Sequence, residues 1–280
     1  MESGKYGGNV MNEKTYRRVL TIAGSDSGGG AGIQADLKTF AANGCYGASV
    51  ITALTAQNTR GVRGIHAAPV EFVAQQLDAV LGDIGADAVK IGMLFSPELI
   101  ATVARKLAEY RIAHIVLDPV MVAQSGDKLL QDDAVAALKT GLAPLAEVLT
   151  PNIPEAEVLL GRSISSYDAM AMAAAELARL GCRNVLVKGG HLEGEASDDC
   201  LYLGAEQRVV RLPGERVETR NNHGTGCTLS SAIAANLAKG AGMEAAVWHA
   251  KEYLTGAIRA GADYRLGHGH GPVHHFWRWW

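Results

Sequence analysis

The chain has 280 residues, of which 48% are apolar and 20% are charged, so it is not a disordered chain and can bury a large core. Its 26 basic and 29 acidic residues give a formal charge of -3, without a long run of either sign. This balance argues against a nucleic acid or an anionic membrane as partner, and it favours a small neutral or anionic ligand.

The four cysteines, Cys45, Cys182, Cys200 and Cys227, are widely spaced and form no Cys-x-x-Cys pair. Their spacing argues against a zinc site or a disulfide framework and indicates a reducing, cytoplasmic location. No apolar run approaches the roughly 18 residues that a membrane span needs. Residues 1–17 lack the apolar stretch of a signal peptide, so we expect a disordered extension or leader before a single domain at 18–280.

From Val19 onward, short runs rich in β-branched residues alternate with longer amphipathic stretches. The run VLTIAG at 19–24 predicts a buried strand, and the glycines that follow predict a turn into a helix over 33–43. Further strands are predicted at 47–54, 88–92, 114–118, 147–150 and 184–188. Helical periodicity is found at 69–83, 96–110, 131–141, 154–160 and 167–181.

Residues 191–220 interrupt this alternation, and we predict a small β-hairpin near 200–212 that adds to the sheet edge. Helices resume over 226–238 and 244–261. The whole pattern predicts an α/β fold, a three-layer α/β/α sandwich with a central, mostly parallel sheet. In such sheets ligands bind beyond the carboxyl ends of the strands, so we expect the functional residues in the loops there.

A Gly-Thr-Gly loop at 224–226 opens directly into a predicted helix and is the sharpest local signal in the chain. Glycines let the backbone approach a ligand closely, and the unpaired amides of a helix N-terminus attract anions. Cys227 lies at that helix start, where we expect the dipole to lower the pKa of its thiol. The alternative interpretation is an ordinary tight loop with a small, half-buried cysteine.

Seven segments at or near the ends of predicted strands carry a family resemblance when they are taken together. They are AGSDSGGGAGIQADLKTF (23–40), ITALTAQNTRGV (51–62), KIGML (90–94), VLDPVM (116–121), TPNIPEAEVL (150–159), VKGGH (187–191) and HGTGC (223–227). They resemble hydroxymethylpyrimidine/phosphomethylpyrimidine kinases, the thiamine-pathway branch of the ribokinase-like superfamily. The ending GHGHGPVHHF at 267–276 also looks like that family's terminus, so the resemblance covers about 19–280.

The resemblance implies a ribokinase-like domain that phosphorylates 4-amino-5-hydroxymethyl-2-methylpyrimidine and then its monophosphate, with ATP as donor and Mg²⁺ as cofactor. The product would be the pyrimidine diphosphate used in thiamine diphosphate synthesis. Two rival functions remain. One is a pyridoxal or pyridoxine kinase, because members of this branch can accept a pyridine with a hydroxymethyl group. The other is a non-catalytic ligand sensor on the same fold.

The resemblance also implies roles for the glycine loop. Cys227 stands where the wider superfamily has an Asp that serves as catalytic base, and a thiol with an ordinary pKa near 8.5 needs the helix N-terminus to act at neutral pH. The amides of Gly224, Thr225 and Gly226 would stabilise charge on the transferring phosphoryl group. Thr225, Gly226 and Lys188, which ends a predicted strand, would contact the nucleotide.

Mg²⁺ is expected at Asn152 and Glu155, which fall on one helical side and resemble the superfamily's metal site. Asp118, at a strand end, is a further candidate for the metal. Taken alone, Glu155 is equally explained as a first-turn carboxylate that the helix dipole favours.

For the substrate, the resemblance points to Gly24, Ala31, Asp36, Gln57 and Met93. Gln57 offers both an acceptor and a donor, Met93 an apolar wall, and Asp36 a partner for the hydroxyl or a ring nitrogen. Taken singly, these three residues are better explained as an ordinary loop Gln, a core Met and an exposed helix Asp.

Two features stand apart from these assignments. Asn222 replaces the Thr that the family usually has before the His of HGTGC. The histidines at 268, 270, 274 and 275 look like a metal tract, but we expect packing roles for them, as for Trp277, Trp279 and Trp280, which would form a tail or a partner contact. A homodimer remains open.

Overall fold

A computed structural model describes residues 14–121, 133–192 and 197–280. The strands are β1 (Arg18–Asp26), β2 (Tyr46–Asn58), β3 (Gly61–Ala67), β4 (Ala88–Ile91), β5 (Ile115–Leu117), β6 (Val148–Leu149), β7 (Asn184–Val187), β8 (Asp199–Leu203) and β9 (Arg208–Leu212). The α-helices are α1 (Gly32–Ala42), α2 (Val70–Asp83), α3 (Pro97–Glu109), α4 (Ala134–Ala137), α5 (Ile153–Leu160), α6 (Tyr167–Leu177), α7 (Thr225–Ala238) and α8 (Met243–Gly261). Shorter π and 3₁₀ turns follow α4 and α6.

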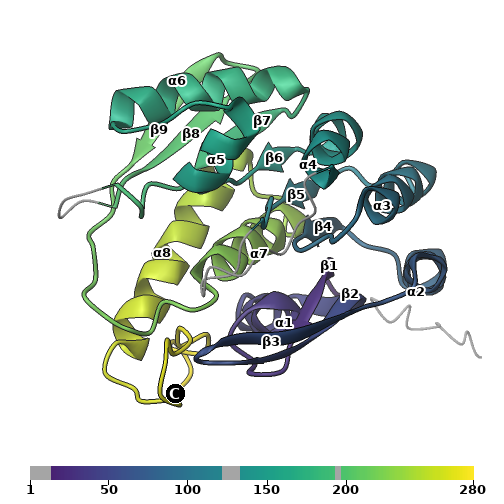
Figure 1. Cartoon of the computed structure of the whole chain (residues 1–280), viewed down its shortest axis with the longest axis horizontal. Coiled ribbons are helices and arrows are strands. Elements are labelled where there is room, and N and C mark those ends of the chain that lie inside the picture. Colours follow the sequence, from purple (N-terminus) through teal and green to yellow (C-terminus); the bar gives the residue numbers. More distant parts are fainter. Residues whose placement is uncertain (1–13, 122–132, 193–196) are drawn as a thin grey trace, which may run out of the picture.

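The strands form one sheet in the order β3-β2-β1-β4-β5-β6-β7-β8-β9. All pairs from β2 through β1, β4, β5 and β6 to β7 are parallel, and both edges are antiparallel. Helices cover both faces (Figure 1). The predicted three-layer sandwich with a mostly parallel sheet is therefore confirmed. The proposed extension at 1–17 and the start of the predicted helix at 131–141 fall mostly outside the described residues.

Each face of the sheet carries its own apolar core. One core includes Leu77 of α2, Ile100 of α3 and Met170 of α6, and the other includes Phe40 of α1 and Ile233 of α7. Strands covered on both sides are apolar at nearly every position, which is why their sequences read as continuous hydrophobic runs. No helix in the described ranges is both long enough and apolar enough to cross a membrane.

The two sheet edges differ in how well the sequence anticipates them. The hairpin predicted near 200–212 is confirmed as β8 and β9, which pair antiparallel. The opposite edge was not predicted, because β2 runs on to Asn58 and turns through Thr59 and Arg60 into the antiparallel β3. That turn lacks the Asn-Gly or Asp-Gly signal of a tight hairpin, and β3 is largely exposed and has no apolar alternation. The hairpin brings the end of β2 over the carboxyl edge of β1.

Candidate active site

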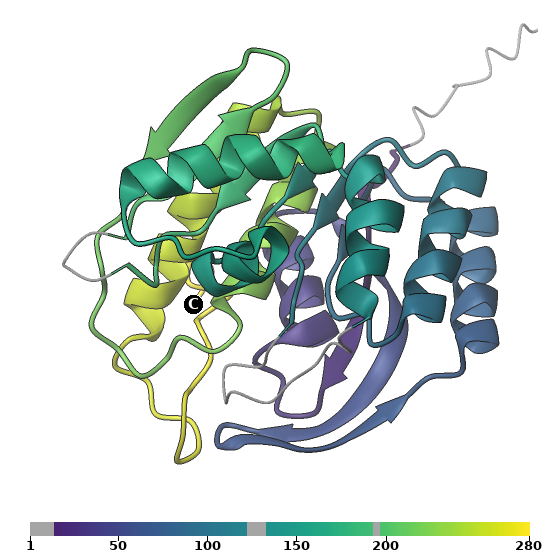
Figure 2. The same cartoon turned by 45° about the horizontal axis from the view of Figure 1, so that its top comes forward.

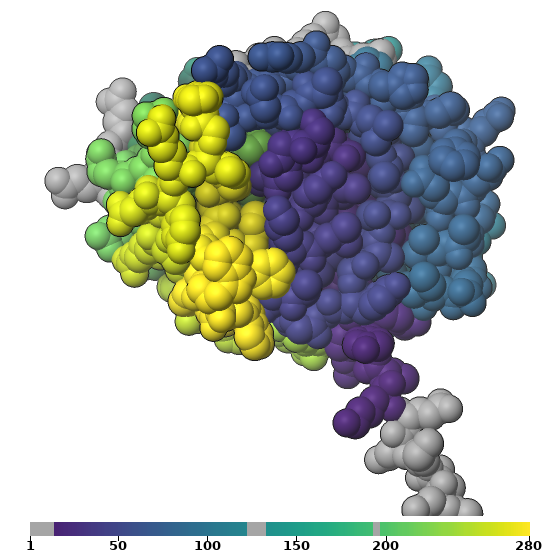
Figure 3. Space-filling view, turned by 90° about the horizontal axis from the view of Figure 1, so that it is seen from below, coloured from purple at the N-terminus to yellow at the C-terminus, as the bar shows by residue number. Residues whose placement is uncertain are grey.

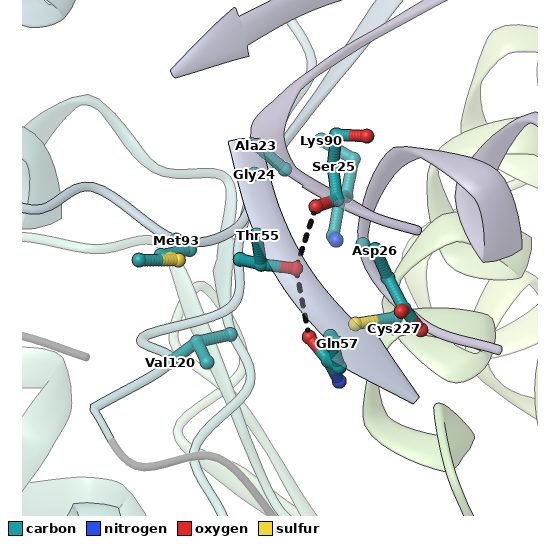
Figure 4. Close-up of a pocket in the computed structure, with 11 residues that line it drawn as sticks. Ala23, Gly24, Ser25, Asp26, Thr55, Gln57, Lys90, Met93, Val120 and Cys227 are labelled. Carbon is teal, nitrogen blue, oxygen red and sulfur yellow. Dashed lines mark hydrogen bonds between the residues drawn. The ribbon is translucent and has the colours of Figure 1, made fainter. Parts of the chain in front are cut away.

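A pocket lies at the carboxyl ends of β1, β2 and β4 (Figure 4). Its lining residues are Ala23, Gly24, Ser25, Asp26, Gly32, Thr55, Gln57, Lys90, Met93, Val120 and Cys227. In Figure 4, Met93 and Val120 lie on one side of Thr55, and Gln57, Asp26 and Cys227 lie on the other. The pocket therefore has an apolar wall opposite a polar one. It brings together four of the predicted residues: Gly24, Gln57, Met93 and Cys227.

Gln57 is fixed at the polar wall by several contacts. Its backbone amide donates to Ser27 Oγ at 2.9 Å, and the Ser27 hydroxyl donates to its carbonyl at 2.8 Å. Thr55, two residues earlier on the same strand face, places its hydroxyl 2.9 Å from the Ser25 carbonyl and 3.1 Å from Gln57 Oε1. One hydroxyl carries one hydrogen, so donation to Ser25 leaves Gln57 Oε1 free to accept from a ligand.

Asp26 organises the glycine turn after β1. Its carboxylate accepts hydrogen bonds from the amides of Gly28, Gly30 and Ala31 at 2.8 to 3.0 Å, and it lies 3.0 Å from His223 Nε2. Burial raises the pKa of Asp26, but the hydrogen bonds with His223 and the amides outweigh burial and hold the pKa below its ordinary value. Ala31 does not line the pocket, and its amide serves this turn instead.

The structure gives Asp36 a different place from the one expected. It is fully buried, and it does not line the pocket. Its carboxylate accepts from Lys90 Nζ at 2.9 Å, from the Thr21 hydroxyl at 2.6 Å and from the Ser231 hydroxyl at 2.7 Å. Burial lowers the pKa of Lys90, but Asp36 outweighs burial and the pKa lies above its ordinary value. Asp36 therefore holds a charged Lys90 at the pocket, rather than offering an open carboxylate to the substrate.

The helix α7 begins at the pocket, since Cys227 in its first turn is one of the lining residues. Its N-cap, Gly224, has a φ of +81° and no side-chain cap. A Cβ there would lie 1.9 Å from the Gly30 carbonyl oxygen, so the close approach of the two glycine loops requires glycine. Among the described residues no side chain caps this turn, so its backbone amides remain the expected place for an anion.

The expectation of a lowered pKa for the Cys227 thiol is wrong. Burial raises the pKa to about 11, and the nearby carboxylates of Asp36 and Asp118 act in the same direction. Lys90 and the Gly32 amide oppose this shift but do not overcome it. The loss of water around the sulfur outweighs the helix N-terminus, so Cys227 is a neutral thiol at pH 7.

Beside the glycine loop lies a buried charged cluster of Asp118, Lys188 and Glu155. Lys188 Nζ donates to Asp118 Oδ1 at 2.8 Å and lies 3.8 Å from Glu155 Oε2. Burial lowers the pKa of Lys188, but the negative charges of Asp118 and Glu155 outweigh burial. The pKa of Lys188 therefore lies above its ordinary value. A Cβ at Gly226 would lie 3.4 Å from Lys188 Nζ, so the loop and the ammonium lie side by side.

The two carboxylates of this cluster are the kind of hard oxygen ligand that Mg²⁺ takes, but Asp118 already accepts hydrogen bonds from Lys188, Thr150 and Ser230. Burial raises the pKa of Glu155 to about 7, and the negative charge of Asp118 contributes, because one ammonium does not balance both acids. Mg²⁺ commonly binds one or two carboxylates and completes its shell with water and phosphate oxygens. The described residues hold no group of three or more His, Cys, Asp or Glu side chains that could hold a metal ion without such help.

Asn152 is used differently from the prediction. Its side-chain oxygen accepts from the Glu155 amide at 2.8 Å, while Glu155 Oε2 accepts from the Asn152 amide at 2.8 Å. This reciprocal pair is a capping box at the start of α5. The Asn152 oxygen is thus already engaged, and its evident role is to orient the helix turn that carries Glu155.

Asp26, Thr55, Lys90 and His223 are site residues that were not predicted from the sequence. Three of them had a signal: Asp26 lies just before three glycines, Thr55 lies two residues before Gln57, and Lys90 is a charge inside an apolar strand. The C-terminal histidines have packing partners where the structure places them. His275 is buried with its Nε2 3.1 Å from Thr228 Oγ1, and His270 Nδ1 lies 3.1 Å from Asn222 Oδ1.

The site therefore joins a half-apolar pocket to the first turn of α7, to Lys188 and to the carboxylates of Asp118 and Glu155. The family model for phosphomethylpyrimidine kinase matches residues 26–274. The chain belongs to this family. It is 57% identical over 263 residues to the hydroxymethylpyrimidine/phosphomethylpyrimidine kinase of Rhizobium meliloti, an alignment that covers 94% of this chain and 98% of the relative.

Two further comparisons show the range of the likeness. The chain is 58% identical over 257 residues to a thiamine biosynthesis bifunctional protein of Geobacter sulfurreducens, but this alignment spans 92% of the chain and only 52% of that protein. Among solved structures, an ADP complex of Bacillus subtilis pyridoxal kinase superposes with a TM-score of 0.86 at 38% identity, covering 93% of this chain and 98% of the other. The ribokinase-like fold expected from the resemblance is thus confirmed.

Proposed function

We propose that the chain transfers the γ-phosphoryl group of ATP to the hydroxymethyl oxygen of 4-amino-5-hydroxymethyl-2-methylpyrimidine, and then a second one to the resulting monophosphate. The product would be the pyrimidine diphosphate used in thiamine diphosphate synthesis. The observation that carries the proposal is one continuous site, in which Gln57 and Cys227 line the pocket and Cys227 also lies in the uncapped first turn of α7. Family membership supports the same activity. We place the enzyme in the cytoplasm because all four cysteines are free.

In this proposal the pocket orients the pyrimidine by shape and by hydrogen bonds. The ring packs against Met93 and Val120, while Gln57 Oε1 accepts from the exocyclic amine and its NH₂ group donates to the adjacent ring nitrogen. The hydroxymethyl group then points to Cys227. Its oxygen bonds to the γ-phosphorus as the bond to the bridging oxygen of ATP breaks and ADP leaves. The hydroxyl proton would pass to an oxygen of the transferred phosphoryl group, because the Cys227 thiol is already protonated.

The charged groups act on the phosphates. The amides of Gly224, Thr225 and Gly226 and the ammonium of Lys188 would offset negative charge on the phosphoryl group and on ADP. Asp118 and Glu155 would hold Mg²⁺, which supplies further charge neutralisation when bound. Because phosphoryl transfer depends mainly on positioning and charge, the neutral Cys227 thiol would orient the hydroxyl without being a preformed thiolate.

The rival activity on pyridoxal has a specific observation in its favour, the likeness to a solved pyridoxal kinase. The pocket argues for the pyrimidine as the preferred substrate, because Gln57 presents an acceptor and a donor side by side. A pyridoxal ring cannot offer the complementary pair of amine and ring nitrogen. Binding pyridoxal would leave a buried amide group unpaired, which costs about 1–3 kcal/mol.

The proposal is tested by measuring ADP release from ATP and Mg²⁺ with the pyrimidine, with its monophosphate and with neither. We expect release with both substrates, and mass spectrometry should find the monophosphate and then the diphosphate. A sensor on the same fold would bind the pyrimidine without added ADP release. Release with the pyrimidine alone would restrict the enzyme to the first phosphorylation.

A further inference from the structure

The C-terminal segment at residues 267–272, GHGHGP, has no part in the proposed chemistry. It follows α8 and lies beside the tip of the β2–β3 hairpin, as the yellow loop and the blue hairpin show in Figure 2. Figure 3 shows the same C-terminal region against the N-terminal half of the chain. Two parts of the sequence about 210 positions apart therefore meet at this place.

Three backbone amides of the segment bind a single residue of the hairpin turn. The amides of His268 and Gly269 donate to Thr59 Oγ1 at 3.2 and 3.1 Å, and the amide of His270 donates to the Thr59 carbonyl at 2.8 Å. The Thr59 hydroxyl is thus the shared acceptor for two of them. These bonds tie the tip of the hairpin to the chain that follows α8.

The glycines of the segment are required by how closely the backbones approach. A Cβ at Gly269 would lie 1.8 Å from the Thr59 carbonyl oxygen, and one at Gly267 would lie 2.3 Å from Thr59 Oγ1. A Cβ at Gly271 would lie 2.1 Å from Asn221 Oδ1. No side chain fits at these positions without moving backbone or neighbours, which explains why glycine recurs at every second residue.

The other side of the segment holds the loop before α7. The His223 amide donates to the Gly271 carbonyl at 3.0 Å, and Asn222 Oδ1 lies 3.1 Å from His270 Nδ1. The side-chain amide of Asn221 donates to the carbonyls of Gly261 and Tyr264 at 2.7 and 2.6 Å. The loop that leads into the phosphate-binding turn is therefore anchored to the same segment as the hairpin.

Gln57 lies on the hairpin and His223 on the loop before α7, the two elements that are bonded to the segment at 267–272. Gln57 pairs with Val62 near the hairpin tip, and its Nε2 lies 3.2 Å from His223 Nε2. A cavity of about 290 Å³ is lined by the hairpin tip, by His223 and by His270. Beside the direct contact between Gln57 and His223, the segment at 267–272 is therefore bonded to both elements around this cavity.

We propose that residues 267–272 form a clasp that sets the distance between Gln57 and His223, so that Thr59 and Gly269 are positioning residues for the pyrimidine. The Thr59 side of the clasp contacts the hairpin at the pocket wall, so we expect the loss of these bonds to act on substrate binding more than on phosphoryl transfer. A kinetic test of the clasp rests on the proposed function, whereas a test by amide hydrogen exchange does not.

The first test replaces Thr59 by Val, which keeps the shape and removes the acceptor of two amides, and by Ser, which keeps the acceptor. We expect Thr59→Val to raise the KM for the pyrimidine roughly three- to tenfold with kcat within about twofold, since two hydrogen bonds are lost and only part of their effect reaches Gln57. Thr59→Ser should behave like the unaltered enzyme. An unchanged KM for Thr59→Val, or equal losses in both variants, would overturn the proposal.

The second test measures amide hydrogen exchange without substrate, so it holds even if the pyrimidine is not the substrate. Gly269→Ala should speed exchange at residues 266–272 and at 57–61, because its Cβ displaces the clasp from Thr59. Gly242→Ala is the matched control, since a Cβ there meets nothing within 4 Å. Unchanged exchange at 57–61 in a folded Gly269→Ala protein would show that the hairpin does not depend on the clasp.

Discussion

At the scale of single residues, Cys227 shows how burial changes the meaning of a motif. The sequence places it at a helix start, where a thiolate is favoured, yet burial raises the pKa of its thiol to about 11. Lys90 is the positive group that opposes this shift most, and Asp36 partly cancels it. The thiol is thus protonated at neutral pH, and the role we propose for it is to orient the substrate hydroxyl.

Cys227→Ala should lower kcat by up to about tenfold, the cost of one orienting hydrogen bond of about 1.4 kcal/mol, and leave the KM for ATP within about twofold. Cys227→Ser should recover part of kcat because it restores a hydroxyl donor. Steady-state kinetics with varied pyrimidine and varied ATP measure both constants. Near-normal kcat in the Ala variant would make Cys227 a packing residue.

Glu155 has two roles, because its side chain completes the capping box of α5 and also carries a negative charge. A Gln at this position can still accept from the Asn152 amide, so the capping box of α5 survives, while the negative charge is lost. We expect Glu155→Gln to raise the Mg²⁺ concentration for half-maximal rate roughly tenfold. Glu157→Gln, on the same helix but bonded to the Ile164 amide, serves as control. An unchanged metal dependence would leave Asp118 as the main carboxylate ligand.

At the scale of elements, the C-terminal tail is fastened to α7 and α8 by one buried histidine. His275 Nε2 lies 3.1 Å from Thr228 Oγ1, and the Tyr253 hydroxyl donates to the His275 carbonyl at 2.6 Å. Burial, with the charges of Lys38 and His274 nearby, lowers the pKa of His275 to about 3. The folded tail therefore holds this ring in its neutral form.

This pKa predicts a loss of stability in mild acid. The unfolded chain takes up a proton at His275 as the pH falls below about 6.5 and the folded protein does not, so stability present above that pH is lost as the pH falls toward 3. From pH 7 to pH 5, His275→Gln should lose about 2 kcal/mol less than the unaltered protein in urea unfolding. The exposed His268→Gln is the control, and equal losses in all three proteins would contradict the assignment.

At the scale of the whole molecule, the central parallel strands were predictable because strands covered on both faces carry continuous apolar runs. The exposed β3 has no such pattern, so the hairpin that positions Gln57 was found only in the structure. The sequence also identified Gln57 and Met93 through the family resemblance, and the pocket contains both. It could not place Asp36, because its burial depends on Lys90, 54 positions away, and Ser231, 195 positions away.

We propose that this pocket selects an aminopyrimidine through Gln57. The most direct measurement is kcat/KM for the pyrimidine and for pyridoxal in the unaltered enzyme and in Gln57→Leu. We expect the unaltered enzyme to favour the pyrimidine, and Gln57→Leu to cut its kcat/KM roughly ten- to a hundredfold while changing that for pyridoxal much less. Equal losses on both substrates, or a preference of the unaltered enzyme for pyridoxal, would contradict the account.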